Sequence, residues 1–172
     1  MKKIFIVMIA VLPLFGLAQE SKLNTLFDKY SGQEGYTSVY ITSYMFELFS
    51  KIADEDQEFD NATKGLEAIK ILTVSDNLST QKREVFYNDV FNALPANMYK
   101  DFMIVKDGEQ EITFKVRDEG NKITEFVMLV KDPHEPVLLF LLGDIDLKQI
   151  SKMSKSMDIK GFEHLEKVEE EN

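Results

Sequence analysis

The 172-residue chain contains no cysteine. No disulfide framework can form, and a thiol nucleophile, a cysteine-ligated zinc site and an iron–sulfur cluster are all excluded. The same absence removes the thiol that could carry a lipid anchor near the start of a mature envelope protein. Histidine is scarce, because the chain holds only His134 and His164. A histidine-rich catalytic zinc site therefore has no basis in this sequence.

Basic residues are also few. The chain has 20 lysines and arginines against 30 acidic residues, which gives a net charge of −10, and its only arginines are Arg83 and Arg117. Without a basic run, the mature chain has no electrostatic footprint for nucleic acid. We therefore expect no nucleic-acid partner, and we interpret the acidic charge as a means of keeping the domain in solution.

A long apolar run occurs only at the N-terminus. Lysines at 2–3 precede an apolar stretch at 4–15, and the small residues Gly16 and Ala18 follow it. This arrangement is typical of a cleaved secretory signal, which we assign to residues 1–18. The apolar stretch is shorter than the ~20 residues that a membrane-spanning helix needs. We expect no stable membrane insertion after cleavage, and a soluble protein without a lipid anchor, in a periplasm or outside the cell.

The remaining residues, 19–172, contain no linker rich in proline, glycine or serine, so we expect a single domain. Apolar residues spaced by three and four predict helices, and β-branched or alternating stretches predict strands. Short connections rich in turn residues, among them Asp107-Gly108, favour antiparallel pairing of the last strands. The predicted helices cover residues 21–31, 42–53, 79–94 and a segment beginning after Asp144 or Asp146, and the predicted strands cover 36–41, 66–75, 99–106, 110–118, 121–131 and 135–143.

The sequence thus predicts an α+β fold, with an antiparallel sheet of about six strands that ends in a four-strand meander and packs with three to five helices. The stretches 126–130 and 137–142 are apolar without alternation, so both faces of these strands must be covered. The N-terminal helix, the final segment or a second molecule could cover them. We expect the apolar residues of each helix to face the core, namely Met45, Leu48, Phe49 and Ile52, then Phe86, Tyr87, Val90, Phe91 and Leu94, and in the last helix Leu147, Ile150, Met153 and Met157.

An acidic twelve-residue stretch that begins at Asp54 resembles the start of a calcium-binding loop. An EF-hand needs glycine at its sixth position and a bidentate glutamate at its twelfth, but these positions hold Phe59 and Gly65. The stretch is therefore not an EF-hand, and we expect a solvated connector. Asp54, Asp56 and Asp60 are kept as candidate ligands for irregular calcium binding.

Catalytic motifs give little support for an enzyme. The chain has no G-x-S-x-G motif and no glycine-rich phosphate loop, and nothing in it indicates a cofactor. Two segments, 63–74 and 159–170, echo each other loosely, which leaves an internal duplication open. Tyr36, Tyr40 and Tyr44 are candidate binding residues, because they lie close together in sequence and exposed tyrosines suit interfaces.

The stretch at 26–53, together with 65–74, resembles a known family. The matching features are Phe27, the run Tyr30 to Gly35, Val39, Met45-Phe46, the strand Ile69 to Thr73 and the later "GDIDLKQISKM". They resemble the bacterial envelope proteins grouped as domain of unknown function 4252. The resemblance implies an exported single domain and supplies no catalytic residues.

We therefore expect an exported, non-catalytic domain that binds another envelope protein or itself. The alternative is a small-ligand-binding or hydrolytic protein with a pocket between the helices and the sheet.

Overall fold

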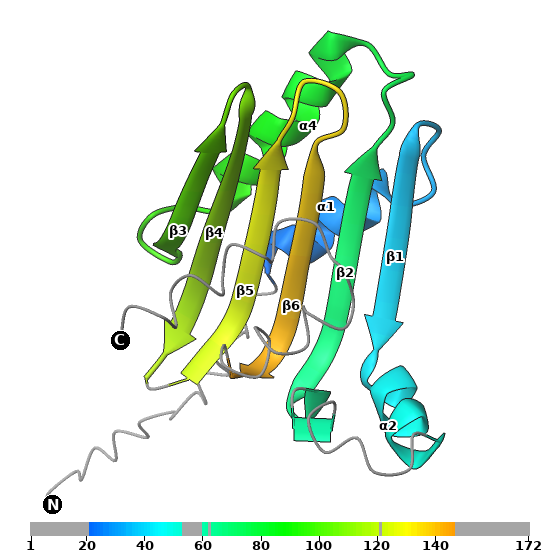
Figure 1. The fold of residues 1–172 in the computed structure, drawn as a ribbon, viewed down its shortest axis with the longest axis vertical. Helices are drawn as coiled ribbons and strands as arrows, with labels where there is room; N and C mark the ends of the chain where they lie inside the picture. Colours follow the sequence, from blue (N-terminus) through cyan, green and yellow to red (C-terminus); the bar gives the residue numbers. More distant parts are fainter. Residues whose placement is uncertain (1–20, 53–59, 62, 121, 147–172) are drawn as a thin grey trace, which may run out of the picture.

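The structure is a computed structural model that describes residues 21–52, 60–61, 63–120 and 122–146. In this part of the chain, six strands form one antiparallel sheet in the order β1-β2-β6-β5-β4-β3, with helices α1 and α4 on one face and α2 beyond the end of β1 (Figure 1). The α+β class and the six-stranded antiparallel sheet are confirmed. The elements are α1 (Lys22–Tyr30), β1 (Tyr36–Thr42), α2 (Ser43–Ile52), β2 (Leu66–Val74), α4 (Thr80–Ala93), β3 (Lys100–Asp107), β4 (Gln110–Glu119), β5 (Lys122–Lys131) and β6 (Val137–Ile145).

Helices α1 and α4 begin at serine caps. The Ser21 side chain accepts a hydrogen bond from the backbone N–H of Leu23, and the Ser79 side chain accepts one from that of Lys82. These bonds satisfy backbone donors that have no partner within the helix. Helix α4 ends before Pro95, as predicted, since the residue before a proline disfavours helical backbone.

One face of the sheet, called here the helix-covered face, packs against α1 and α4. At its centre, Phe140 of β6 is fully buried and contacts the ring of Phe27 edge-on, with 6.3 Å between centroids. Of the three covers considered from the sequence, the N-terminal helix lies on this face, together with α4. The buried residues of this core are Leu23, Phe27, Tyr30, Leu72, Val74, Phe86, Val90, Ala93, Leu94, Tyr99, Val127, Leu129, Leu138 and Phe140.

The other side of the sheet, called here the opposite face, carries a second apolar cluster. Successive residues along β5 and along β6 belong alternately to the two clusters, so these strands are apolar on both faces as predicted. Among the described helices, α2 reaches this cluster through Phe46. The predicted last helix lies outside the described residues. The buried residues of the cluster are Phe46, Leu66, Ile69, Ile112, Phe114, Val116, Phe126, Met128, Val130, Leu139, Leu141 and Ile145.

Three details of the sequence prediction are wrong. Met45, Leu48 and Phe49 do not face a core in the described structure, because α2 lies beyond the end of β1 and buries Phe46 instead. Phe91 is half exposed on α4, whose buried face runs through Phe86 and Val90. The turn between β3 and β4 is made by residues 108–109, one position later than predicted, with the left-handed φ of +60° at Gly108.

A buried polar network joins α1 to the sheet at Glu125 of β5. The Glu125 carboxylate accepts hydrogen bonds from Tyr99 at 2.7 Å, from Ser21 at 3.0 Å and from Arg117 at 2.8 Å. Only 5% of Glu125 is exposed. A buried charge is tolerated when it is paired and hydrogen-bonded, and this carboxylate is both.

A second polar cluster ties α1 to α4. Asp89 accepts hydrogen bonds from Lys29 and from the Tyr30 hydroxyl, both at 2.6 Å. These two donors lower the pKa of Asp89. Burial, together with the hydrogen bond to Asp89, raises the pKa of Tyr30 to about 12. Burial and the Glu125 hydrogen bond likewise raise the pKa of Tyr99 to about 12.

The raised tyrosine pKa values predict that the protein loses stability at alkaline pH. In the unfolded chain, a tyrosine loses its proton near pH ~10. Between this pH and about 12, the folded state binds more protons than the unfolded state, so the free energy of unfolding falls as pH rises. Each tyrosine contributes a slope of at most about 1.4 kcal/mol per pH unit. Urea unfolding at several pH values measures this slope, and the double variant Tyr30→Phe/Tyr99→Phe should flatten it. An unchanged slope in that variant contradicts the assignment.

Candidate functional site

Strand β1 forms one edge of the sheet (Figure 1). Within the described residues it pairs with β2 and has no strand on its other side. Its sequence, YTSVYIT, contains no charged residue and no proline. Exposed edges of this kind present unpaired backbone N–H and C=O groups that other chains can bind.

Large apolar side chains are exposed on β1 and on α2, which follows it directly. Val39 pairs with Ile71 on the opposite face and Tyr40 pairs with Lys70 on the helix-covered face, so what we call the β1–α2 surface runs along both sides of the sheet edge and onto α2. Met45 and Leu48 lie at helical spacing on α2, and Tyr44 lies beside them on the first turn. The exposed fractions are 41% for Val39, 58% for Tyr40, 68% for Tyr44, 36% for Met45, 43% for Leu48 and 48% for Phe49. Grouped exposure of this kind marks interaction sites, whereas single exposed apolar residues are common on any protein surface.

The three candidate tyrosines have different environments. Tyr36 is half-buried against Tyr30 and Phe86, with ring centroids 4.8 and 5.9 Å apart, and burial raises its pKa. Its role is therefore structural. Tyr40 and Tyr44 are both exposed and belong to the β1–α2 surface.

The side chain of Lys70 on β2 packs against the Tyr40 ring. Its ammonium group lies 4.9 Å from the ring centroids of both Tyr40 and Phe27, and it donates a hydrogen bond to Asn24 at 2.8 Å. Cation–π contacts of this kind are worth ~0.5–2 kcal/mol, depending on how far the cation is desolvated. Because only 9% of Lys70 is exposed, the Tyr40 ring rests on a buried support and is oriented before any partner binds.

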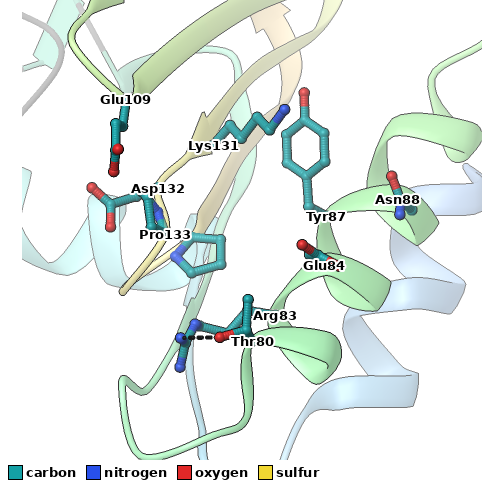
Figure 2. Close-up of a pocket in the computed structure, with 10 residues that line it drawn as sticks. Thr80, Arg83, Glu84, Tyr87, Asn88, Glu109, Lys131, Asp132 and Pro133 are labelled. Carbon is teal, nitrogen blue, oxygen red and sulfur yellow. Dashed lines mark hydrogen bonds between the residues drawn. The ribbon is translucent and has the colours of Figure 1, made fainter.

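A pocket of about 310 Å³ lies elsewhere, between α4 and the loops at the ends of the neighbouring strands (Figure 2). The ammonium group of Lys131 lies over the Tyr87 ring, 5.3 Å from its centroid. Burial raises the pKa of Tyr87. The lining residues are Thr80, Arg83, Glu84, Tyr87, Asn88, Glu109, Lys131, Asp132, Pro133 and Pro136.

Two charged side chains of this pocket, Asp132 and Arg83, form hydrogen bonds with the backbone of nearby loops. Asp132 accepts hydrogen bonds from the backbone N–H groups of Glu135 and His134 and from the side chain of Gln110, and these bonds lower its pKa. The Arg83 guanidinium donates to the backbone oxygens of Asp76 and Leu78 and to Thr80. The pocket therefore does not present these two charges freely to a ligand.

The candidate calcium ligands are only partly described. Asp54 and Asp56 lie outside the described residues, and Asp60 is exposed and lines an open pocket of about 520 Å³ between α2 and the start of β2. In the described part of the chain, no three histidine, aspartate or glutamate side chains are grouped so that they could hold a metal ion. His134 is exposed in the turn between β5 and β6, as expected from its sequence context.

Ser79 and Lys82 have the S-x-x-K spacing that some serine hydrolases use. Here the Ser79 oxygen accepts a hydrogen bond from the backbone N–H of Lys82 at 3.4 Å, and both residues are exposed at the start of α4. This geometry caps the helix, so the spacing gives no support for a nucleophile.

The candidates Tyr40 and Tyr44 are exposed in the structure, whereas the exposure of Met45, Leu48 and Phe49 was not predicted from the sequence. Met45, Leu48 and Phe49 have the spacing of a core-facing helix stripe, and spacing alone does not distinguish a core from an interface. The position of α2 beyond the end of the sheet makes the difference. The residues that line the pocket were not identified from the sequence, because they come from three separate parts of the chain.

None of the described helices is long and apolar enough to cross a membrane. Comparison with curated proteins and with solved structures finds no match. The family model for the domain of unknown function DUF4252 matches residues 30–153, which include β1, α2 and all the later strands. This match covers more than half of the chain, so the protein belongs to the DUF4252 family.

Proposed function

We propose that the protein is an exported bacterial envelope protein that acts without catalysis, by binding a protein partner through the β1–α2 surface. The observation that carries this proposal is the grouping of six exposed large apolar residues between Val39 and Phe49, on an open sheet edge and the helix that follows it. The N-terminal pattern of residues 1–18 supports export.

The composition of this surface fits protein recognition. Aromatic residues and methionine are enriched in interfaces, while charged residues are depleted from interface cores. Residues 36–46 contain no charged side chain, although 29% of the whole chain is charged. A tyrosine whose ring is already supported, as Tyr40 is by Lys70, loses little conformational entropy on binding.

The pocket beside α4 is less suited to carry the function. Its size fits a small ligand, since ligand pockets are commonly ~300–1,000 Å³ in volume. However, the charged groups of Asp132 and Arg83 are bound to loop backbone, so they stabilise the walls of the pocket.

The proposal predicts that charged substitutions on α2 prevent partner binding while the domain stays folded. In the variant Tyr44→Lys/Leu48→Lys, two lysines replace side chains that are 68% and 43% exposed. Desolvating a lysine at an interface core is costly, so we expect at least a tenfold loss of captured partner. The free energy of unfolding should change by no more than about 1 kcal/mol, because each exposed substitution usually contributes at most ~0.5 kcal/mol.

The measurement is proximity cross-linking of the tagged, exported protein in living cells, with affinity capture and mass spectrometry. The same material gives the mature N-terminus, expected at Gln19. The matched control is Val85→Lys/Phe91→Lys on α4, whose side chains are 49% and 50% exposed. Equal recovery of cross-linked partner from the α2 variant and from the unchanged protein would refute the proposal.

A further inference from the structure

The two edges of the sheet are protected to different degrees. Edge strands commonly avoid unwanted pairing through charged side chains and β-bulges. Strand β3, at one edge, has both: its eight residues include Lys100, Asp101, Lys106 and Asp107, and its register shifts between Asp101 and Met103. Strand β1, at the other edge, has no charged residue and pairs with β2 in continuous register over all seven residues. The β1 edge is therefore built so that it can accept another strand.

Two hydrogen bonds establish which backbone groups of β1 point outward. Ser75 N–H donates to the oxygen of Gly35 at 2.9 Å, so this directly opposed pair is hydrogen-bonded. In an antiparallel ladder, every second pair is of this kind, which directs the backbone groups of residues 37, 39 and 41 toward β2. The bond from Val74 N–H to Pro136 O, on the other side of β2, agrees with this alternation. The N–H and C=O groups of Ser38 and Tyr40 therefore point away from the sheet.

These outward groups are complementary to those of a second copy of β1. If two β1 strands run antiparallel about a two-fold axis at Val39, Ser38 of each copy lies opposite Tyr40 of the other. Each of these two pairs can exchange two backbone hydrogen bonds, which makes four in total. The small Ser38 leaves room for the Tyr40 ring. The two Val39 side chains, each 41% exposed, meet in the pair at the axis.

We propose that a second copy of this chain is the partner, joined by antiparallel pairing of β1 with β1 about Val39. A two-fold interface requires a self-complementary surface, and the register of Ser38, Val39 and Tyr40 provides one. The neutral stretch of residues 36–46 lets two copies approach although the chain as a whole is strongly acidic. This inference rests on the proposed binding role of the β1–α2 surface and specifies its occupant.

The absence of cysteine allows a direct test with the purified mature protein. Val39 and its copy form the non-hydrogen-bonded pair at the axis, with Cα atoms ~4.5 Å apart. This distance lies within the ~4.4–6.8 Å range of disulfides, so Val39→Cys should give a covalent dimer under mild oxidation. In Thr37→Cys the two thiols are offset by four residues, or ~13 Å along the strands, and should not bridge.

We expect Val39→Cys to dimerise at least tenfold faster than Thr37→Cys and than Ile104→Cys on β3, where the replaced side chain is 50% exposed. Light scattering of the unchanged mature protein should give the mass of two chains, and that of Val39→Lys the mass of one, with the circular dichroism spectrum of a folded domain. A monomeric unchanged protein, or equal rates for the three cysteine variants, overturns the proposal. A monomer that still captures a foreign partner through α2 overturns only the self-pairing and leaves the proposed function in place.

Discussion

Replacing Phe140 with alanine is expected to lower the free energy of unfolding by about 3–5 kcal/mol. Phe140 lies on β6 between β2 and β5, is fully buried, and packs against Phe27 of α1 and the ammonium group of Lys70. The substitution removes the transfer free energy of the ring and leaves a cavity that a six-stranded sheet cannot easily collapse. Urea unfolding followed by circular dichroism measures the change.

The matched control for this experiment is Phe91→Ala. Phe91 is also a phenylalanine of the described fold, but it is 50% exposed on α4, where it stacks on Tyr87. We expect a change of no more than about 1 kcal/mol, because half of the ring is already in water. Similar losses for the two variants would mean that the helix-covered core does not dominate the stability of the domain.

Replacing Glu125 with alanine is expected to cost about 3 kcal/mol. The substitution takes away the acceptor of three hydrogen bonds and leaves Arg117, Tyr99 and Ser21 to find other partners. Breaking a buried ion pair from one side costs ~3–5 kcal/mol, because the other charge stays desolvated. We expect a stability loss at the lower end of this range, because the Arg117 side chain is 20% exposed and also contacts Glu119.

Glu125→Gln distinguishes loss of charge from loss of hydrogen bonding. Glutamine keeps the shape of the side chain and one acceptor oxygen, so this variant should lose clearly less stability than the alanine variant. Both are measured by urea unfolding at neutral pH. If alanine proves no worse than glutamine, the network contributes through its charge alone.

Local patterns in the sequence were sufficient to predict most of the secondary structure. Ser21 and Ser79 are both capping residues placed before an apolar periodic stretch, and both cap helices in the structure. The unbroken apolar stretches of β5 and β6 indicated two covered faces, and the two clusters confirm it. These features could be predicted because each depends on residues a few positions apart.

Sequence reasoning was less successful wherever the result depended on tertiary position. Leu48 and Phe86 both lie on apolar helix stripes, yet Leu48 is 43% exposed and Phe86 is fully buried. The difference arises because α4 lies across the sheet whereas α2 lies beyond its end (Figure 1). The hydrogen-bond network around Glu125 could not be predicted from local sequence patterns either, because it joins residues up to 104 positions apart.

The strand order also determines when the sheet can be completed. Strand β6 lies between β2 and β5, so the pair β1-β2 and the group β3-β4-β5 meet only through it. Strand β2 (residues 66–74) can therefore pair along its inner edge only with β6, which lies about seventy positions later in the chain. Without β6, the strand order leaves β2 and β5 each with one unpaired edge, so pairing of distant segments must precede completion of the sheet. On the proposed export route, the sheet cannot close until residues 137–145 have crossed the membrane.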